Sequence, residues 1–259
     1  LRSIVAVLFE NPNLERVPLN IRDIESGIVT RAHQVMHPEF FEFNSIDDYH
    51  KKIQSGKVIL QPEDRKARVV REGKRLAEAK GFYLVEDDKL LEEIIGLTEY
   101  PIPILGEIPK ELLSIPEEVI VTSMKEHQKF LSLRNNTNGK VEGFLVVADL
   151  QTYDHQKTIL SGNMRVLYSR LKDAIFFYQN DLSVVKLHGM KAWNNKLKSV
   201  RFHEKLGSQY DRVERIVKIA VLLAKQFELE PDEVCNAAFL IKADLVSNLV
   251  TEFPSLQGT

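Results

Sequence analysis

The sequence has one cysteine, Cys235, among 259 residues, and it has no long apolar run. A single thiol excludes a disulfide framework and a zinc–thiolate cluster, and it indicates a reducing compartment. The longest apolar stretch, from Ile216 to Ala224, is interrupted by Lys218 and falls well short of the roughly 20 residues that a membrane-spanning helix needs. The sequence therefore predicts no membrane segment, and we expect a cytoplasmic protein.

An excess of charge of one sign is also missing. The chain carries 35 basic and 37 acidic side chains, a formal charge of −2, with 44% hydrophobic and 28% charged residues. This composition is ordinary for a folded protein and excludes disorder as the main state. Because the overall charge is close to zero, any contact with nucleic acid must use a local basic patch.

An initial methionine is absent as well. The first residue is Leu1, and the four methionines all lie inside the chain. The first residues form a short apolar run that is typical of a strand rather than of a signal peptide. We interpret the sequence as a piece of a longer protein.

Strand and helix signals alternate as far as about residue 182. Strands are predicted for five apolar or β-branched runs: residues 1–8, 17–21, 58–60, 119–124 and 143–150. Helices are predicted where a capping residue or a proline is followed by acidic residues: residues 45–54, 62–80 and from 87 onward. Asn135–Gly139 predicts a hairpin turn. Residues 1–182 are therefore predicted to form an α+β (mixed α/β) domain.

After residue 182 the apolar positions follow the period of a helix. Between Val213 and Ala224 they recur every three or four residues, and a similar face runs from Val234 to Leu249. Pro231 and the two acidic residues after it are typical of a helix start. We predict that residues 183–259 form an all-helical domain that is cut off before its end.

Two histidines have a spacing that is known from metal sites. His33 and His37 are four residues apart, which places two imidazoles on one helical face and suits zinc. Pro38 follows directly, no glutamate lies between the histidines, and no third ligand is nearby. We therefore predict no metal site and favour a structural or RNA-contacting role for both histidines.

Two polar clusters are candidates for contacts with nucleic acid. Residues 125–129 follow a predicted strand, and their dense donors could line a cleft. A turn at Gly162–Asn163, with Arg165 and Arg170 behind it, could hold a phosphate. The alternatives are a solvated helix start for the first cluster and an ordinary helix cap for the second, with the aromatic residues 176–178 in the core.

The segment from Lys186 to Lys218 is strongly basic. It carries nine basic and three acidic side chains, and Trp193 lies inside it. A cationic patch with an aromatic residue suits RNA, whereas the alternative is a solvated amphipathic surface. The sequence leaves both interpretations open.

Catalytic patterns are weak. His203 and Asp244 suggest a helical metal phosphohydrolase, but that chemistry needs adjacent His-Asp ligands, and Ala243 precedes Asp244. Cys235 lies on an apolar helix face without a persuasive histidine partner, which is typical of a core thiol. We predict no catalytic residue in this chain.

Five blocks of sequence resemble one family. The stretch E-L-L-S-I-P-E-E-V-I-V-T-S-M-K-E-H-Q-K-F, residues 111–130, resembles the β subunit of bacterial glycyl-tRNA synthetase. Four further blocks are similar to the same family: residues 30–38, 161–181, 202–216 and 242–258. The blocks occur in the family's order and span nearly the whole chain.

The resemblance implies a middle section of such a β subunit. Residues 1–182 look like the editing-type domain of the phenylalanyl-tRNA synthetase β chain, and residues 183–259 look like the start of an HD-type domain. In the family, a separate α subunit activates glycine with ATP and Mg²⁺, and the β subunit binds tRNA in an assembly of two α and two β chains. The chain is therefore expected to support ATP-dependent glycylation of tRNA without a catalytic centre or cofactor of its own.

The chain departs from the family pattern at two places that bear on this expectation. Ala32 stands where glycine is usual, and Ala243–Asp244 resembles a decayed HD motif. Proofreading is not implied either, because glycine is the smallest amino acid and a snug pocket can exclude larger ones.

Polar clustering beside strand and turn signals selects nine hypothetical tRNA-cleft residues: Arg31, His33, Lys125, His127, Gln128, Lys129, Asn163, Arg165 and Arg170. Two other classes of function stay open. One is a hydrolase, either an aminoacyl-tRNA deacylase or an HD-type metal phosphohydrolase. The other is a purely structural module that docks the α subunit.

Overall fold

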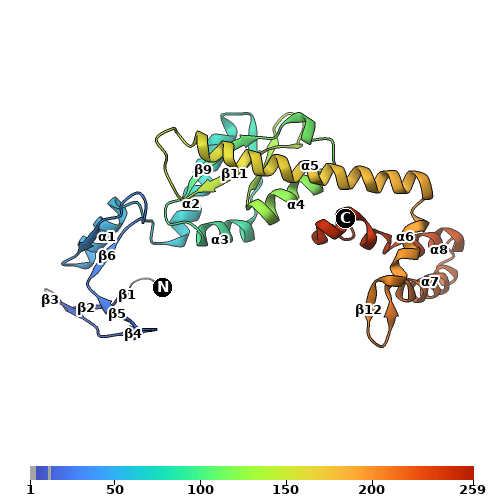
Figure 1. The fold of residues 1–259 in the computed structure, drawn as a ribbon, viewed down its shortest axis with the longest axis horizontal. Coiled ribbons are helices and arrows are strands. Elements are labelled where there is room, and N and C mark those ends of the chain that lie inside the picture. The colour runs from blue at the N-terminus through green and yellow to red at the C-terminus, as the bar shows by residue number, and fades with distance from the viewer. Residues whose placement is uncertain (1–3, 11–12) are drawn as a thin grey trace. The chain divides into compact units, whose positions relative to one another are not determined.

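The computed structural model describes residues 4–10 and 13–259, and its mixture of helices and strands confirms the predicted α+β class (Figure 1). The chain divides into two compact units. Unit 1 comprises residues 1–107 and 129–164, and unit 2 comprises residues 108–128 and 165–259. The predicted domain boundary after residue 182 falls inside one helix, α5 (Lys157–His188), which contributes residues to both units.

A four-stranded antiparallel sheet forms the centre of unit 1. Its strand order is β8 (Phe82–Leu84), β10 (Leu131–Asn135), β11 (Val141–Ala148) and β9 (Ile102–Glu107). β10 and β11 form the hairpin that the sequence predicts, and Gly139 in its turn has a φ of 70°. Only glycine adopts this left-handed conformation without steric strain, which explains the residue at that position.

Two helices bury one face of this sheet: α2 (Pro62–Glu78) and α3 (Asp88–Gly96). Their apolar residues form one buried cluster with those of the sheet, including Val69, Ala77, Leu91, Leu133 and Leu145. Each fully buried leucine contributes about 2 kcal/mol, whereas a helix cap contributes about 1 kcal/mol. The stability of unit 1 therefore depends mainly on this packing.

An aromatic pair fills the opposite face of the sheet. Phe144 of β11 stacks on Phe130 with ring centroids 4.8 Å apart, and both side chains are buried. A Cβ at Gly106 of β9 would lie 2.2 Å from Cζ of Phe144. The ring therefore requires glycine at residue 106.

Short strands precede this sheet in unit 1. β1 (Ile4–Val5), β5 (Ile24–Gly27) and β4 (Asn20–Ile21) form one small sheet. Two antiparallel pairs accompany it: β2 (Val7–Glu10) with β3 (Asn13–Arg16), and β6 (Val29–Arg31) with β7 (Phe40–Glu42). The strand predicted for residues 1–8 is thus two strands from residue 4 onward, and residues 1–3 lie outside the described residues.

The helix predicted from Ser45 is present as α1 (Ile46–Ser55). The Ser45 hydroxyl accepts a hydrogen bond from the Asp48 backbone amide at 3.1 Å, as the capping pattern requires. The helix ends at Gly56, where a Cβ would lie 2.1 Å from Cβ of the buried Ala32. Gly56 thus leaves room for the methyl group of Ala32.

Unit 2 is mainly helical. Besides α5 it contains α4 (Glu117–Gln128), α6 (Lys191–Lys196), α7 (Gln209–Gln226), α8 (Pro231–Leu240) and α9 (Asn248–Glu252). Short 3₁₀ turns lie at Lys110–Leu112, Leu197–Ser199, Ala243–Val246 and Pro254–Leu256. A hairpin of β12 (Arg201–His203) and β13 (Gly207–Ser208) interrupts the helices. The prediction that residues 183–259 are all helical was wrong at this hairpin.

A buried carboxylate connects two helices of unit 2. Asp181 lies on α5 and is 7% exposed. One of its oxygens accepts hydrogen bonds from the backbone and side-chain nitrogens of Asn248, and the other accepts one from the Leu249 amide, all within 3.0 Å. The Asp181 carboxylate therefore supplies the hydrogen-bond acceptors that the first backbone amides of α9 need, and these bonds hold α9 against α5.

Two predicted strands are absent. Residues 119–124 lie in α4, because Pro116 and the acidic Glu117 and Glu118 favour a helix start. The buried positions 119, 120, 123 and 124 follow the period of a helix. Residues 58–60 are irregular, and the Arg65 guanidinium donates to the carbonyl oxygens of Ile59 and Leu60 at 2.6 and 2.9 Å. These two carbonyl oxygens therefore accept from a side chain instead of from a neighbouring strand.

None of the helices in residues 4–10 and 13–259 is both long enough and apolar enough to cross a membrane.

Gly56→Ala is expected to destabilise unit 1 by about 1–3 kcal/mol, because the added methyl group overpacks against Ala32. Ala32→Gly in the same chain is expected to recover most of this loss, since it removes the opposing methyl. Urea unfolding of the two single variants and the double variant measures the coupling. If the stability changes of the two single variants add up to that of the double variant, residues 32 and 56 are not in contact.

Asp181→Ala is expected to lower the unfolding free energy by about 2–3 kcal/mol, because it leaves the amides at the start of α9 without their acceptor. Asp173→Ala, at an exposed position of the same helix, is the control and is expected to change stability by less than about 0.5 kcal/mol. Equal losses in the two variants would show that the contact with α9 contributes nothing.

Candidate functional site

His33 lies in unit 1 in the turn that follows β6. Its side chain is 4% exposed, so it is a buried polar group that needs hydrogen-bond partners. Its backbone amide donates to the carbonyl oxygen of Gly56 at 3.0 Å, and its own carbonyl accepts from the His37 amide at 2.9 Å. These backbone bonds fix the turn and direct the imidazole toward the end of β11.

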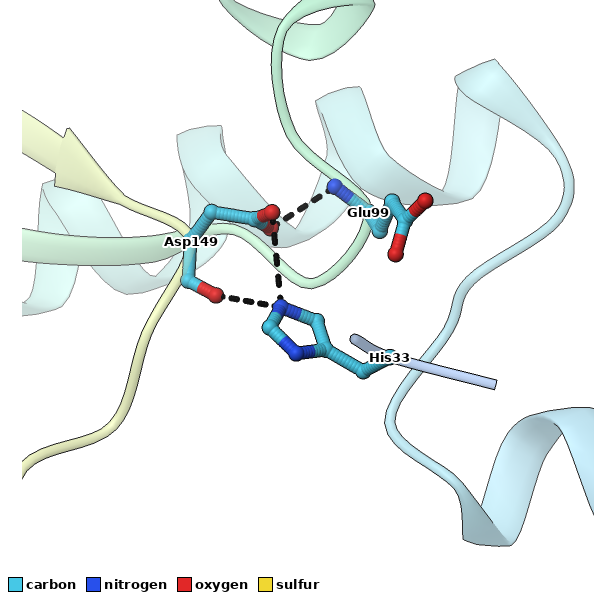
Figure 2. Close-up of side chains that lie close together, drawn as sticks. All are labelled: His33, Glu99 and Asp149. Carbon is cyan, nitrogen blue, oxygen red and sulfur yellow. Dashed lines mark hydrogen bonds and ion pairs between the residues drawn. The ribbon is translucent and has the colours of Figure 1, made fainter. Parts of the chain in front are cut away.

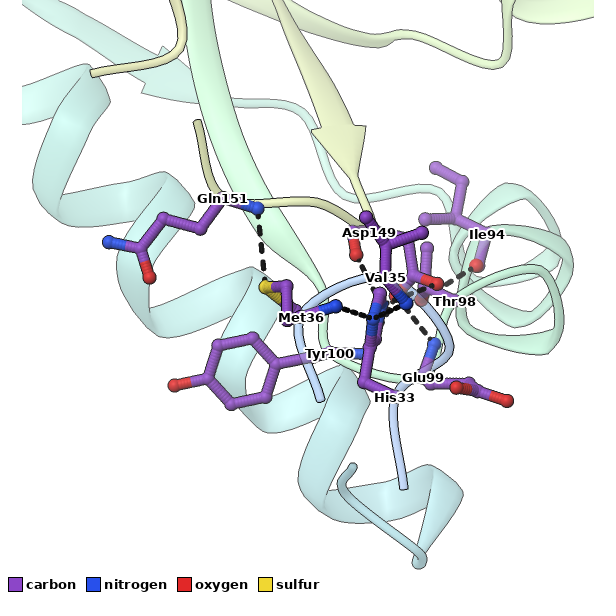
Figure 3. A network of polar contacts seen from close by, with 9 residues as sticks. All are labelled: His33, Val35, Met36, Ile94, Thr98, Glu99, Tyr100, Asp149 and Gln151. Atoms are coloured by element: carbon purple, nitrogen blue, oxygen red, sulfur yellow. Dashed lines mark hydrogen bonds and ion pairs between the residues drawn. The ribbon is translucent and has the colours of Figure 1, made fainter. Parts of the chain in front are cut away.

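Both ring nitrogens of His33 have partners. Figure 2 shows Nε2 facing Asp149, 2.6 Å from its carbonyl oxygen and 3.4 Å from its carboxylate Oδ2. Nδ1 accepts from the backbone amides of Val35 and Met36 at 3.3 and 3.1 Å (Figure 3). Since a carbonyl oxygen can only accept, Nε2 carries a proton, and the two amides require Nδ1 to be unprotonated. The contacts therefore define the neutral Nε2–H tautomer.

Asp149 joins three segments of unit 1. It follows directly on β11, and its Oδ1 accepts from the backbone amides of Glu99 and Tyr100, each at 2.7 Å (Figure 3). Its carbonyl oxygen accepts from His33. The same residue thus fixes the end of the strand, the segment between α3 and β9, and the turn after β6. We call His33, Glu99, Tyr100 and Asp149 the His33–Asp149 node.

The node contains the one group in the described part of the chain that has the composition of a metal site. Ligand atoms of His33, Glu99 and Asp149 all lie within 4.8 Å of one another. The imidazole nitrogen that faces these carboxylates is the one that donates to the Asp149 carbonyl, and a protonated nitrogen has no lone pair for a metal. The geometry therefore fits a hydrogen-bonded structural node better than a metal site. His37, the other predicted histidine, lies outside this group, 3.5 Å from Glu39.

The nine residues predicted for a tRNA cleft are distributed over both units. Unit 1 contains Arg31, His33, Lys129 and Asn163, and unit 2 contains Lys125, His127, Gln128, Arg165 and Arg170. Arg31 lies over the Phe40 ring at 5.6 Å, and Lys129 forms an ion pair with Glu93 at 2.9 Å. His33 is buried in the node, so RNA cannot reach its ring while the node is intact.

In unit 2, residues 125–128 end α4, so they do not follow a strand as the sequence predicts. His127 is exposed and meets Phe253 edge-on at 5.7 Å, whereas Gln128 is half-buried. Lys125 is exposed, as is Arg165 of α5. Arg170 is 3.6 Å from Glu252, a pairing of two partly exposed groups that contributes little to stability.

The predicted phosphate-binding turn at residues 161–163 is wrong. These residues lie inside α5, where backbone amides are bonded to carbonyl oxygens of the preceding turn and cannot cradle an anion. The Asn163 side chain also bonds within the helix, donating to the Ile159 carbonyl at 2.8 Å. The aromatic residues further along α5 are only partly core: Phe176 is 59% exposed.

The basic segment, residues 186–218, presents cations on several elements of unit 2. Arg201, His203 and Lys205 are all exposed on the β12–β13 hairpin. Lys198 lies over the Tyr210 ring at 4.7 Å, and Arg212 over the Phe202 ring at 4.5 Å. Trp193 is 7% exposed and belongs to the core, so it is not a platform for base stacking.

The suggested phosphohydrolase pair does not come together as a metal group. His203 is exposed on the hairpin, and the Asp244 carboxylate accepts from the Gly258 amide at 2.9 Å. Among the described residues, neither belongs to a group of ligands close enough to share an ion. Asp244 instead borders an apolar cavity of about 390 Å³ in unit 2, together with Tyr178, Trp193 and Leu249.

Sequence reasoning missed Asp149 and Glu99. Neither residue belongs to a recognisable motif, and Asp149 is 116 positions away from His33. No sequence signal singles out Asp149, because it falls inside the strand predicted for residues 143–150.

Comparison with known proteins agrees with the sequence blocks described above. A family model described as glycyl-tRNA synthetase beta subunit matches residues 1–259. The glycine–tRNA ligase beta subunits of Paracoccus denitrificans and Dinoroseobacter shibae are each 44% identical over 258 residues, which is 100% of this chain and 38% and 36% of those proteins. That of Trichlorobacter lovleyi is 36% identical over 243 residues, 93% of this chain and 35% of that protein.

The chain is thus related to subunits of an aminoacyl-tRNA synthetase. The chain belongs to the glycyl-tRNA synthetase beta subunit family, which confirms the resemblance. It spans a little over a third of the length of the relatives it matches.

The tautomer of His33 provides a direct test of the node. In ¹⁵N NMR of the imidazole we expect a protonated Nε2 and an unprotonated Nδ1, and we expect added Zn²⁺ to leave the melting temperature unchanged. A zinc-dependent rise in melting temperature that His33→Ala abolishes would instead establish a metal site.

Proposed function

We propose that this chain is a segment of the β subunit of a glycine–tRNA ligase and supports ATP-dependent glycylation of tRNA by binding tRNA and a catalytic α subunit. The observation that carries the proposal is the family match over residues 1–259, together with relatives whose names state this role. In this proposal the chain has no catalytic centre, and ATP and Mg²⁺ are used by the α subunit. The proposed assembly contains two α and two β chains in the cytoplasm.

The basic segment supports a contact with RNA in unit 2. The chain as a whole is nearly neutral, yet residues 186–218 carry nine basic and three acidic side chains. Exposed cations such as Arg201 and Lys205 can neutralise phosphates and release counterions. Two of the basic groups, Lys198 and Arg212, lie over aromatic rings, which orders them at the surface. We propose this segment as a phosphate-binding surface, in addition to the exposed members of the predicted cleft residues.

The finer domain assignments belong to the same proposal. We propose that residues 1–182 are related to the editing-type domain of a phenylalanyl-tRNA synthetase β chain, and that residues 183–259 begin an HD-type domain. Ala243 stands before Asp244, where the motif has its histidine, so the proposed HD-type domain has no hydrolase activity.

The alternatives have less support. A hydrolase needs an assembled set of ligands or a nucleophile with its base, and the one candidate group among the described residues is the hydrogen-bonded His33–Asp149 node. A module that only docks the α subunit does not account for the exposed cations of the basic segment.

The experiment that tests the proposal is tRNA binding over a salt series, with and without the α subunit. A binding constant whose logarithm falls linearly with the logarithm of the salt concentration would support RNA contacts within these residues. The slope of this line estimates the number of contacts. Binding of the α subunit without any binding of tRNA would favour the docking module. Release of amino acid from charged tRNA would favour the hydrolase.

The double variant Arg201→Ala, Lys205→Ala is expected to reduce the slope of log K against log salt by about one for each phosphate that these side chains neutralise. Affinity is expected to decrease by a similar factor for RNAs of different sequence. Arg71→Ala is the matched control, because Arg71 is also exposed but lies on α2 outside the candidate residues. An unchanged slope in the double variant would remove the hairpin from the proposed phosphate-binding surface.

A further inference from the structure

The loop between β11 and α5, together with the first residue of α5, has two kinds of residue in alternation. Thr152, Asp154 and Gln156 are half-buried, whereas Tyr153, His155 and Lys157 are exposed. The first set forms a hydrogen-bonded network, and the second set presents a phenol ring, an imidazole and an ammonium group to solvent. None of the three exposed residues is among the candidates selected from the sequence.

The half-buried residues hold the loop in one conformation. The Thr152 hydroxyl lies 2.5 Å from Asp154 Oδ1 and accepts from the Gln156 backbone amide at 3.0 Å. The other carboxylate oxygen of Asp154 accepts from the backbone amide and the hydroxyl of Thr158, at 2.8 and 2.5 Å. The Gln156 side-chain oxygen accepts from the Thr152 amide at 3.2 Å, which closes the network.

This network is maintained at neutral pH. The hydroxyls of Thr152 and Thr158, with the Thr158 amide, lower the pKa of Asp154 to about 2, so the carboxylate stays ionised and continues to accept these hydrogen bonds. The network also holds His155 and Gln156 at φ values of 56° and 69°, a left-handed conformation that residues other than glycine rarely adopt. The loop is therefore a rigid support for the side chains that it exposes.

The exposed residues have the chemistry of a nucleotide contact. Tyr153 has a relative exposure of 106%, so both faces of its ring are open. Its neighbours in the loop are polar, and a protein-binding hot spot would instead need an apolar surround that excludes water. An open aromatic ring on a segment that also exposes an imidazole and an ammonium group is suited to stacking on an unpaired base and contacting its phosphate.

We propose that the loop of residues 152–157 is a contact for an unpaired nucleotide of RNA, with Tyr153 as the stacking group. Lys157 contacts a phosphate, and His155 lies at the edge of the contact. This inference rests on the proposed function, since the RNA is the tRNA that the β subunit binds. Unlike the basic segment, the loop binds mainly through stacking, because Asp154 offsets the charge of Lys157.

The test is the affinity of tRNA for the full-length protein assembled with its partner subunit. Tyr153→Ala is expected to weaken binding by about 5- to 100-fold, the range observed when one base–aromatic stack is removed. Tyr153→Phe keeps the ring and is expected to bind within about twofold of the unchanged protein. The salt slope is expected to be the same in all three proteins, because each retains the same cations facing phosphates.

Tyr83→Ala is the matched control, because Tyr83 is 46% exposed on β8 of the same unit. If Tyr153→Ala binds tRNA as well as this control does, the loop contact is overturned while tRNA binding by the subunit stands. If Ala and Phe weaken binding equally, stacking is overturned. If Tyr153→Ala no longer binds the partner subunit but still binds tRNA, the loop is a protein contact. If the unchanged protein does not bind tRNA, the proposed function and this inference both fail.

Discussion

A hydrogen bond from His33 Nε2 to the carbonyl oxygen of Asp149 ties the N-terminal strands of unit 1 to its central sheet. The strands before residue 45 are two to four residues long, and such short pairings are not stable in isolation. The two residues of the hydrogen bond are 116 positions apart. Forming this contact before the sheet has folded therefore costs a large loss of chain entropy. The N-terminal part therefore depends on a sheet whose own packing does not require it.

The backbone next to His33 leaves little space for a larger side chain. The methyl group of Ala32 is buried, and a Cβ at Gly56 would lie 2.1 Å from it. The Gly56 carbonyl accepts from the His33 amide, so the space for the methyl and the position of the imidazole depend on the same residue. A larger side chain at residue 56 would displace both. The packing of Ala32 against residue 56 and the His33–Asp149 node are therefore coupled through the backbone.

The sequence alone predicts the elements that local signals determine, but it does not predict features that depend on contacts between distant residues. Capping at Ser45, the turn at Asn135–Gly139 and the proline at residue 231 are local signals, and each element begins or turns where predicted. Residues 119–122 are β-branched but follow an acidic helix start, and burial on a helical face overrides their strand propensity. The His33–Asp149 node could not be predicted, because its partners come from three separated segments.

A nearly neutral chain can bind an anionic polymer only if it separates its charges along its surface. Here nine basic side chains gather in residues 186–218, and several carboxylates elsewhere are engaged in contacts within the protein. Asp181 binds the start of α9, Asp149 binds backbone amides, and Asp154 binds two threonines. These carboxylates accept hydrogen bonds from protein donors and hold the structure together. Cationic and stacking contacts also differ in their response to salt: counterion release sets the slope of log K against log salt, whereas stacking shifts its intercept. A surface that uses both can retain RNA at salt concentrations where charge alone is too weak.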